Sequence, residues 1–190
     1  MKTVNYDAII KSRLSEKRYI HSLNVAKEAV RLAKKYGADE EKAYIAGILH
    51  DICKEDSPET QLQIIEKYGI TVDEFTLQST KLYHAKAGAA YVLGELGIED
   101  EDIINAILYH TTARKNMSIL ETIIYLADYI GEDRNYNGVD EMRTETEKSV
   151  LDGMIYALKF TMQDLAGREL VIHPDTFDAY NQYILEKRGS

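Results

Sequence analysis

Six side chains that could bind a metal interrupt the apolar patterns of this chain. They are imidazoles and carboxylates that lie far apart in the sequence, apart from one adjacent His-Asp pair. A charged or strongly polar group in apolar surroundings is costly unless something compensates it, and one divalent cation compensates several such groups at once. The sequence therefore predicts a buried metal site. Its six candidate ligands are His21, His50, Asp51, His84, His110 and Asp128.

Asp128 is the strongest of these signals when each residue is considered alone. It is the only charged residue between Ile123 and Ile130, and an unpaired carboxylate buried there would be strongly destabilising. An ion pair with Arg18 or Lys54 would compensate it but would leave the histidines unexplained. A cation accounts for the carboxylate and the imidazoles together.

The histidines are weaker signals one by one. Taken alone, His21 is best interpreted as a partly exposed residue near a helix start, and His110 as a helix-end histidine bonded to a backbone carbonyl. His84 lies among small residues, a pattern that more often indicates close helix packing than a binding site. His50 and Asp51 differ, because consecutive helical residues point about 100° apart and can approach two sides of one ion or bridge two ions.

Two cationic side chains follow these positions. Lys54 lies three residues after Asp51 and so shares its side of a helix, which makes it a candidate phosphate ligand rather than an ordinary solvated lysine. Arg134 lies in the polar loop 131–140, directly after Asp128. Its guanidinium is suited to a bidentate grip on phosphate, although it could also pair with a neighbouring acidic residue at the surface.

Length and composition limit the class of protein. The 190 residues fit a single domain, 1–190, large enough to fold without disulfides. One cysteine, Cys53, and an N-terminus without a basic region followed by an apolar stretch favour the cytoplasm. The longest apolar runs are well short of the roughly 20 residues that cross a bilayer. A net charge of −9 repels nucleic acid, so we expect a small anionic substrate bound through local positive charge.

Helices must position the six candidate ligands. Apolar residues recur at spacings of three and four, and strand-like alternation is nearly absent, so we expect an all-α fold of about eight or more helices. Gly37 should end the first long helix, and the pairs Thr71 to Glu74 and Ser118 to Glu121 have capping-box spacing. Further helices are predicted to begin at Pro58, after Gly97, and at Pro174.

From about Arg18 to Asn181, the chain resembles the HD-domain superfamily of metal-dependent phosphohydrolases. Within it, the chain is most similar to the YqeK-type symmetrical bis(5'-nucleosyl)-tetraphosphatases. One departure is the segment 131–134, Gly-Glu-Asp-Arg, where such proteins usually have a glutamate-proline turn before the arginine. The motifs that carry the resemblance are Arg18-Tyr19-Ile20-His21-Ser22, Leu49-His50-Asp51-Ile52-Cys53-Lys54, His84-Ala85-Lys86-Ala87-Gly88-Ala89, Tyr109-His110-Thr111-Thr112, Ala127-Asp128-Tyr129-Ile130 with Arg134, and Ile172-His173-Pro174-Asp175-Thr176.

The resemblance implies one or two ions, most simply iron, although this ligand chemistry also suits manganese or zinc. His84 and His110 would either complete a second metal position or contact phosphate oxygens, and the sequence leaves both readings open. The implied ligands of the tightly held ion are His21, His50, Asp51 and Asp128.

The activity that the resemblance implies is hydrolysis of diadenosine tetraphosphate at the middle of its phosphate chain, giving two ADP. A bound cation would acidify the attacking water, and fixed donors would meet the charge that develops on the phosphate. The expected catalytic residues are Asp51, Lys54, His84 and His110. The expected substrate-binding residues are Arg18, Lys54, His84, His110, Arg134, His173, Thr176 and Asn181, of which His173 has a structural role at a helix start as its default interpretation.

Two other functions stay open. One is an HD-type phosphohydrolase acting on a nucleoside monophosphate, a deoxynucleoside triphosphate or an alarmone. The other is a helical nucleotide-binding module without catalysis, which the retention of all six candidate ligands disfavours. A small-molecule nucleotide is the expected partner, with no nucleic acid and no membrane, and a homodimer is a further hypothesis.

Overall fold

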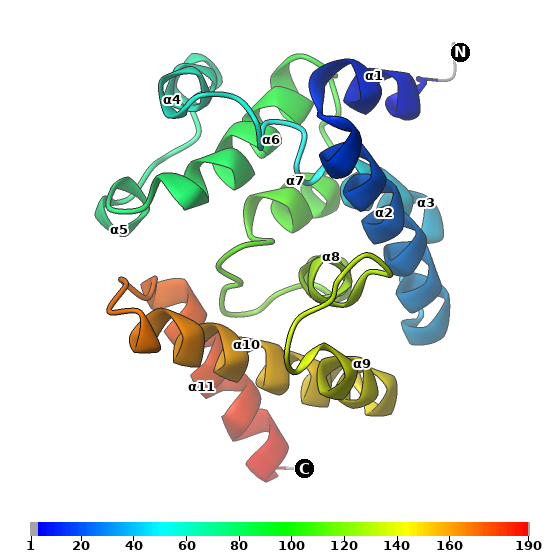
Figure 1. Cartoon of the computed structure of the whole chain (residues 1–190), viewed down its shortest axis with the longest axis vertical. Helices are drawn as coiled ribbons and strands as arrows, with labels where there is room; N and C mark the ends of the chain where they lie inside the picture. The colour runs from blue at the N-terminus through cyan, green and yellow to red at the C-terminus, as the bar shows by residue number, and fades with distance from the viewer. Residues whose placement is uncertain (1–3, 190) are drawn as a thin grey trace.

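The computed structural model describes residues 4–189 and is entirely helical over that range, which confirms the predicted fold class (Figure 1). Residues 1–3, part of the N-terminus on which the cytoplasmic prediction rests, lie outside the described residues. The helices are α1 (Tyr6–Arg13), α2 (Glu16–Tyr36), α3 (Glu40–Leu49), α4 (Pro58–Lys67), α5 (Glu74–Leu77), the 3-10 helix η1 (Thr80–Leu82), α6 (Tyr83–Gly94), α7 (Glu101–Leu108), α8 (Ile119–Ile130), α9 (Val139–Lys148), α10 (Val150–Gly167) and α11 (Pro174–Gly189).

Helix α8 forms the centre of the core. It packs against α2, α3, α7, α9 and α10, and its residues from Leu120 to Ala127 are all buried. A helix whose residues are buried on every face needs neighbours that cover all of those faces, as they do here. Figure 1 shows α1 to α3 on one side of α8, α4 to α7 above it and α9 to α11 below. Between residues 4 and 189, no helix has the length and apolarity that a bilayer span requires.

Most helix ends follow the predicted local signals. Gly37 ends α2 in the left-handed conformation, with φ of 77°, which glycine adopts at no steric cost. Ser118 and Glu121 form a reciprocal capping box at the start of α8. The predicted capping box from Thr71 is wrong: α5 begins only at Glu74, and the carboxylate of Asp73 accepts the hydrogen bond from the backbone N–H of Thr76. Asp is the stronger capping group, and it lies one residue before the helix.

A close crossing of α2 and α3 brings His21 toward the His-Asp pair. At the crossing, a Cβ added to Gly47 would lie only 2.8 Å from the Cα of Ala26 and 3.3 Å from the Cβ of Ala29. Backbone atoms cannot move aside as a flexible side chain can, so the helices approach this closely only because residue 47 has no side chain.

We predict that Gly47→Ala destabilises the fold by about 1–3 kcal/mol, because the added methyl group overpacks the crossing. The free energy of unfolding in urea measures the effect. Gly167→Ala is the matched control, since a Cβ at Gly167 has no heavy atom within 4 Å, and we expect it to change stability by less than about 0.5 kcal/mol. Equal stabilities for the two variants would contradict the close crossing.

Candidate metal centre

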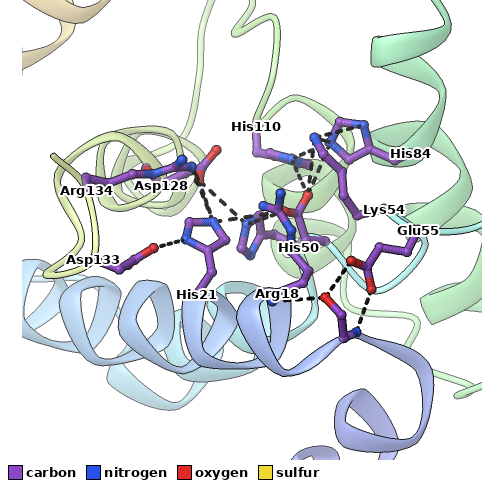
Figure 2. A network of polar contacts seen from close by, with 12 residues as sticks. Arg18, His21, His50, Lys54, Glu55, His84, His110, Asp128, Asp133 and Arg134 are labelled. Atoms are coloured by element: carbon purple, nitrogen blue, oxygen red, sulfur yellow. Dashed lines mark hydrogen bonds and ion pairs between the residues drawn. The ribbon is translucent and has the colours of Figure 1, made fainter. Parts of the chain in front are cut away.

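The structure brings the six predicted ligands together from five parts of the chain (Figure 2). His21 lies on α2, His84 on α6 and Asp128 on α8, while the other three follow the ends of α3 and α7. The four histidines and Asp51 are each at most 4% exposed, whereas the side chain of Asp128 is 18% exposed. The cluster is therefore almost completely removed from solvent but remains open at Asp128.

Asp51 lies in the middle of this cluster. Its Oδ2 is 3.5 Å from His50 Nε2 and 3.9 Å from His21 Nε2. Its Oδ1 faces the other pair, at 3.2 Å from His84 Nε2 and 3.6 Å from His110 Nε2. Each carboxylate oxygen thus serves a different pair of imidazoles, an arrangement that can support two neighbouring cation positions.

Asp128 lies on the side of the cluster opposite His84 (Figure 2). Its Oδ1 is 3.0 Å from His21 Nε2 and 3.8 Å from His50 Nε2. Three overlapping groups have ligand atoms close enough together to hold an ion: His21, His50 and Asp51; His50, His110 and Asp128; and Asp51, His84 and His110.

Two of the histidines are oriented by the ends of the helices that precede them. The sequence places His50 inside a helix, but α3 ends at Leu49 and His50 follows it in a turn. Its Nδ1 donates to the carbonyl of Gly47, and His110 Nδ1 donates to the carbonyl of Ile107, each at 2.7 Å. These carbonyls belong to the last turns of α3 and α7, which have no helical N–H partner. In the neutral imidazoles, both Nε2 lone pairs therefore face the cluster.

Unsatisfied polar atoms indicate that the cluster fits a cation. Among the described residues, His50 Nε2 and Asp51 Oδ1 are buried without a hydrogen-bond partner. Leaving such atoms unpaired costs about 1–3 kcal/mol each. A cation would satisfy both, and an oxygen and nitrogen donor set suits iron, manganese or zinc.

The protonation states also favour metal binding. Burial raises the pKa of Asp51, but the interactions of its carboxylate with the surrounding imidazoles, those of His50 first, outweigh burial and hold that pKa well below its usual range. Burial likewise raises the pKa of Asp128, and His21, His50 and Arg134 together lower it well below normal. Desolvation lowers the pKa of His84 to about 4. Anionic carboxylates and a neutral imidazole are the forms that bind cations.

The cationic residues predicted from the sequence surround this cluster. Arg18 Nη1 lies 2.7 Å from Asp51 Oδ2. Lys54 Nζ lies 2.9 Å from His84 Nε2, and burial lowers the pKa of this lysine. The guanidinium of Arg134 donates to the backbone carbonyl of Asp128 at 2.6 Å and also contacts its carboxylate.

Sequence reasoning missed three residues that support the centre. Asp133 Oδ2 lies 2.8 Å from His21 Nδ1. Arg143 donates to the backbone carbonyls of Ile130, Gly131 and Arg134 and so fixes the loop after α8. Glu55 accepts two hydrogen bonds from Ser15, each at 2.6 Å. Asp133 could have been found from its place in the polar loop, but no pattern in the sequence marks Arg143 or Glu55.

The predicted nucleotide residues divide into two groups. His173 and Thr176 line a cavity of about 490 Å³, formed by residues 78–82, Thr111 and Thr112, and the ends of α10 and α11. Both also have internal partners: His173 Nε2 lies 3.0 Å from an oxygen of Asp73, and the Thr176 hydroxyl donates to the carbonyl of Thr112 at 2.7 Å. Asn181 is partly exposed on α11, outside the residues that line the cavity.

Residues 18–133 match the family model described as the HD domain, and this range contains all six clustered ligands. The chain belongs to the HD domain family. A relative from Halalkalibacterium halodurans is 42% identical, over 95% of this chain and 96% of its own length. Another from Bacillus subtilis is 41% identical, over 92% and 93%. Both are named symmetrical bis(5'-nucleosyl)-tetraphosphatase.

A solved structure agrees with this HD domain along its whole length. It comes from Clostridium acetobutylicum and is described as a predicted HD superfamily hydrolase involved in NAD metabolism. Its sequence is 38% identical, its TM-score is 0.92, and the match covers 97% of this chain and 99% of the other. The helical arrangement that surrounds the cluster is therefore also the one found in this solved structure.

We predict that His50→Ala and Asp51→Ala each remove the bound metal, because each deletes a ligand shared by more than one group in the cluster. Elemental analysis of the purified protein measures this loss. His173→Ala is the control, since His173 is bonded to Asp73 instead of facing the cluster. Metal content at the wild-type level in both ligand variants would show that the ion binds elsewhere.

Proposed function

We propose that this HD domain protein is a metal-dependent hydrolase that cleaves diadenosine tetraphosphate symmetrically into two ADP. The observation that carries the proposal is the buried cluster of four imidazoles and two carboxylates, in a chain that matches relatives named symmetrical tetraphosphatase over nearly its full length. The site residues and the substrate are parts of this proposal.

The cavity supplies room for a nucleoside next to the cluster. Thr111, in its wall, directly follows His110, and Leu82 precedes His84 by two residues. Thr161, also in the wall, lies 2.6 Å from the hydroxyl of Tyr129, the residue after Asp128. Three parts of the cavity wall are thus connected, along the chain or by a hydrogen bond, to residues next to the cluster. Its volume of about 490 Å³ lies within the usual range for small-molecule sites.

Local positive charge would hold the phosphate chain. The protein carries a net charge of −9, so a polyanion binds only where cations outweigh that field. Arg18, Lys54 and Arg134 provide such a region, each in contact with a residue of the cluster. Arg18 and Arg134 would turn from their carboxylate partners toward phosphate groups, two oxygens of which a guanidinium can also bind through two N–H groups.

His110 is better suited to a second cation position than to a direct phosphate contact. Its Nδ1 already donates to Ile107, so the neutral ring presents only an accepting lone pair at Nε2. His84 Nε2 lies 3.2 Å from that nitrogen, and the lowered pKa of His84 keeps the His84 ring neutral. Phosphate oxygens are acceptors and would find no donor at His110. We therefore assign His84, His110 and Asp51 Oδ1 to a second cation.

The groups at the site would have different roles in the proposed hydrolysis. A cation held by the cluster would supply Lewis acidity toward a phosphoryl oxygen and would acidify water. The forming bond joins the water oxygen to one of the two inner phosphorus atoms, and the bond from that phosphorus to the central bridging oxygen breaks. Lys54, Arg18 and Arg134 bind the negative charge that builds up on the phosphate and on the departing ADP.

Several further features belong to the same proposal. We propose iron as the bound metal and a single HD domain over residues 1–190. The lone thiol, Cys53, is buried and unpaired among the described residues, in keeping with a reducing cytoplasm. A homodimer is a further hypothesis, and a measurement of the molecular mass in solution tests it.

Product analysis tests the reaction. We predict that the metal-loaded protein converts diadenosine tetraphosphate into ADP as the sole nucleotide product, resolved by anion-exchange chromatography. Formation of ATP and AMP would contradict symmetrical cleavage. Parallel incubations with a nucleoside monophosphate, a deoxynucleoside triphosphate, an alarmone and NAD test the alternative substrates, and faster turnover of any of these would replace the proposed one.

We predict that Arg134→Lys lowers kcat/KM by about 10- to 100-fold, the equivalent of one lost charge-assisted hydrogen bond, while the metal content stays unchanged. Lysine retains the charge but cannot grip phosphate through two parallel N–H groups. Steady-state kinetics and elemental analysis of the same preparation separate the two effects. Loss of metal in this variant would assign the arginine to holding Asp128 instead.

A further inference from the structure

His21 differs from the two cluster histidines that are oriented by helix ends. His50 and His110 each donate from Nδ1 to a carbonyl three residues earlier in the chain. His21 lies in the first turns of the long helix α2, where backbone carbonyls are already bonded within the helix. Its Nδ1 instead faces the carboxylate of Asp133, at 2.8 Å, from the loop that follows α8 (Figure 2).

We propose that Asp133 is a positioning residue for the metal ligand His21. The carboxylate accepts the Nδ1–H of the imidazole, and this contact holds the ring with Nε2 toward Asp128 and Asp51, where a bound ion would take the Nε2 lone pair. A ligating histidine held in this way is better oriented and more basic than a free one. The inference rests on the metal site within the proposed function and extends it to a residue outside the ligand set.

The loop around Asp133 is built to hold this contact. Gly131 leaves space for the carboxylate, because a Cβ at position 131 would lie 3.2 Å from Asp133 Oδ1. Arg143 anchors the same loop through three backbone carbonyls. Gly131 and Asp133 both belong to the segment where the chain departs from the glutamate-proline turn of the proteins it resembles. The departure thus coincides with the carboxylate that contacts His21.

The neighbouring Glu132 provides a matched control. It carries the same charge in the same loop, but its side chain is 74% exposed and pairs with Lys27, which is 75% exposed. Exposed pairs of this kind contribute little to stability. Glu132→Ala therefore removes one negative charge near the centre without touching His21.

Metal affinity is the first test, measured without nucleotide by competition for Zn²⁺ or Mn²⁺ with a chelator. We expect Asp133→Ala to raise the dissociation constant by about 10- to 100-fold, the usual effect of removing such a partner. Asp133→Asn, whose amide oxygen still accepts a hydrogen bond, should recover much of that loss, and Glu132→Ala should match the wild type. Should Asp133→Ala fail to fold, Asp133→Ser takes its place in the series.

The hydrogen bond from the His21 Nδ1–H is the second test, and it is independent of substrate. In Zn²⁺-saturated protein labelled with ¹⁵N-histidine, we expect this Nδ1–H to exchange slowly with water because Asp133 accepts it, with the signal assigned through its disappearance in His21→Gln. Asp133→Ala should lose this protection, while Glu132→Ala keeps it. An unchanged exchange rate together with equal dissociation constants in the two alanine variants would overturn the proposal. Failure to hydrolyse diadenosine tetraphosphate would affect neither measurement.

Discussion

The burial of polar metal-binding groups in an apolar helical core is the constraint on which the rest of this structure depends. Asp51 and the four cluster histidines have almost no contact with solvent, and two of their atoms lack a hydrogen-bond partner in the described part of the chain. In such a place the carboxylates repel each other and some polar atoms stay without a hydrogen bond, unless a cation binds these groups together. The free-energy cost of burying these polar groups accompanies the function, since the same groups form the proposed metal site of the HD domain.

The ends of helices α3 and α7 orient two of the cluster histidines. His50 and His110 follow the last turns of α3 and α7, and each uses a carbonyl left unpaired by the end of its helix to fix one ring nitrogen. One interaction thereby satisfies the helix terminus and directs the other nitrogen toward the metal. His21 and His84 lie inside helices and lack such carbonyls, so side chains from elsewhere, Asp133 and Lys54, contact their rings.

The net charge of the whole protein and the charge of the basic side chains at the cluster have opposite signs. Over the whole chain the negative charge dominates, yet the guanidinium and ammonium groups of Arg18, Lys54 and Arg134 gather at the cluster. In the absence of substrate they pair with Asp51, Asp128 and His84. A phosphate chain offers the same groups equivalent oxygen acceptors, so binding would exchange internal ion pairs for contacts with the substrate instead of exposing unpaired charge.

The sequence alone determined the all-helical class, the main helix ends and the identity of the six clustered side chains, because periodicity, capping residues and isolated polar groups are local signals. The sequence-based prediction was wrong at Thr71, because Asp73, two residues later, is the capping residue. It was also wrong at His50, which follows the end of helix α3 instead of lying within it. Only the tertiary structure decided which atoms face one another: the division of Asp51 between two pairs of imidazoles, the contact of Asp133 with His21 and the three carbonyls bound by Arg143. These contacts join residues brought together by the crossing of helices, and no spacing along one chain segment encodes such a distance.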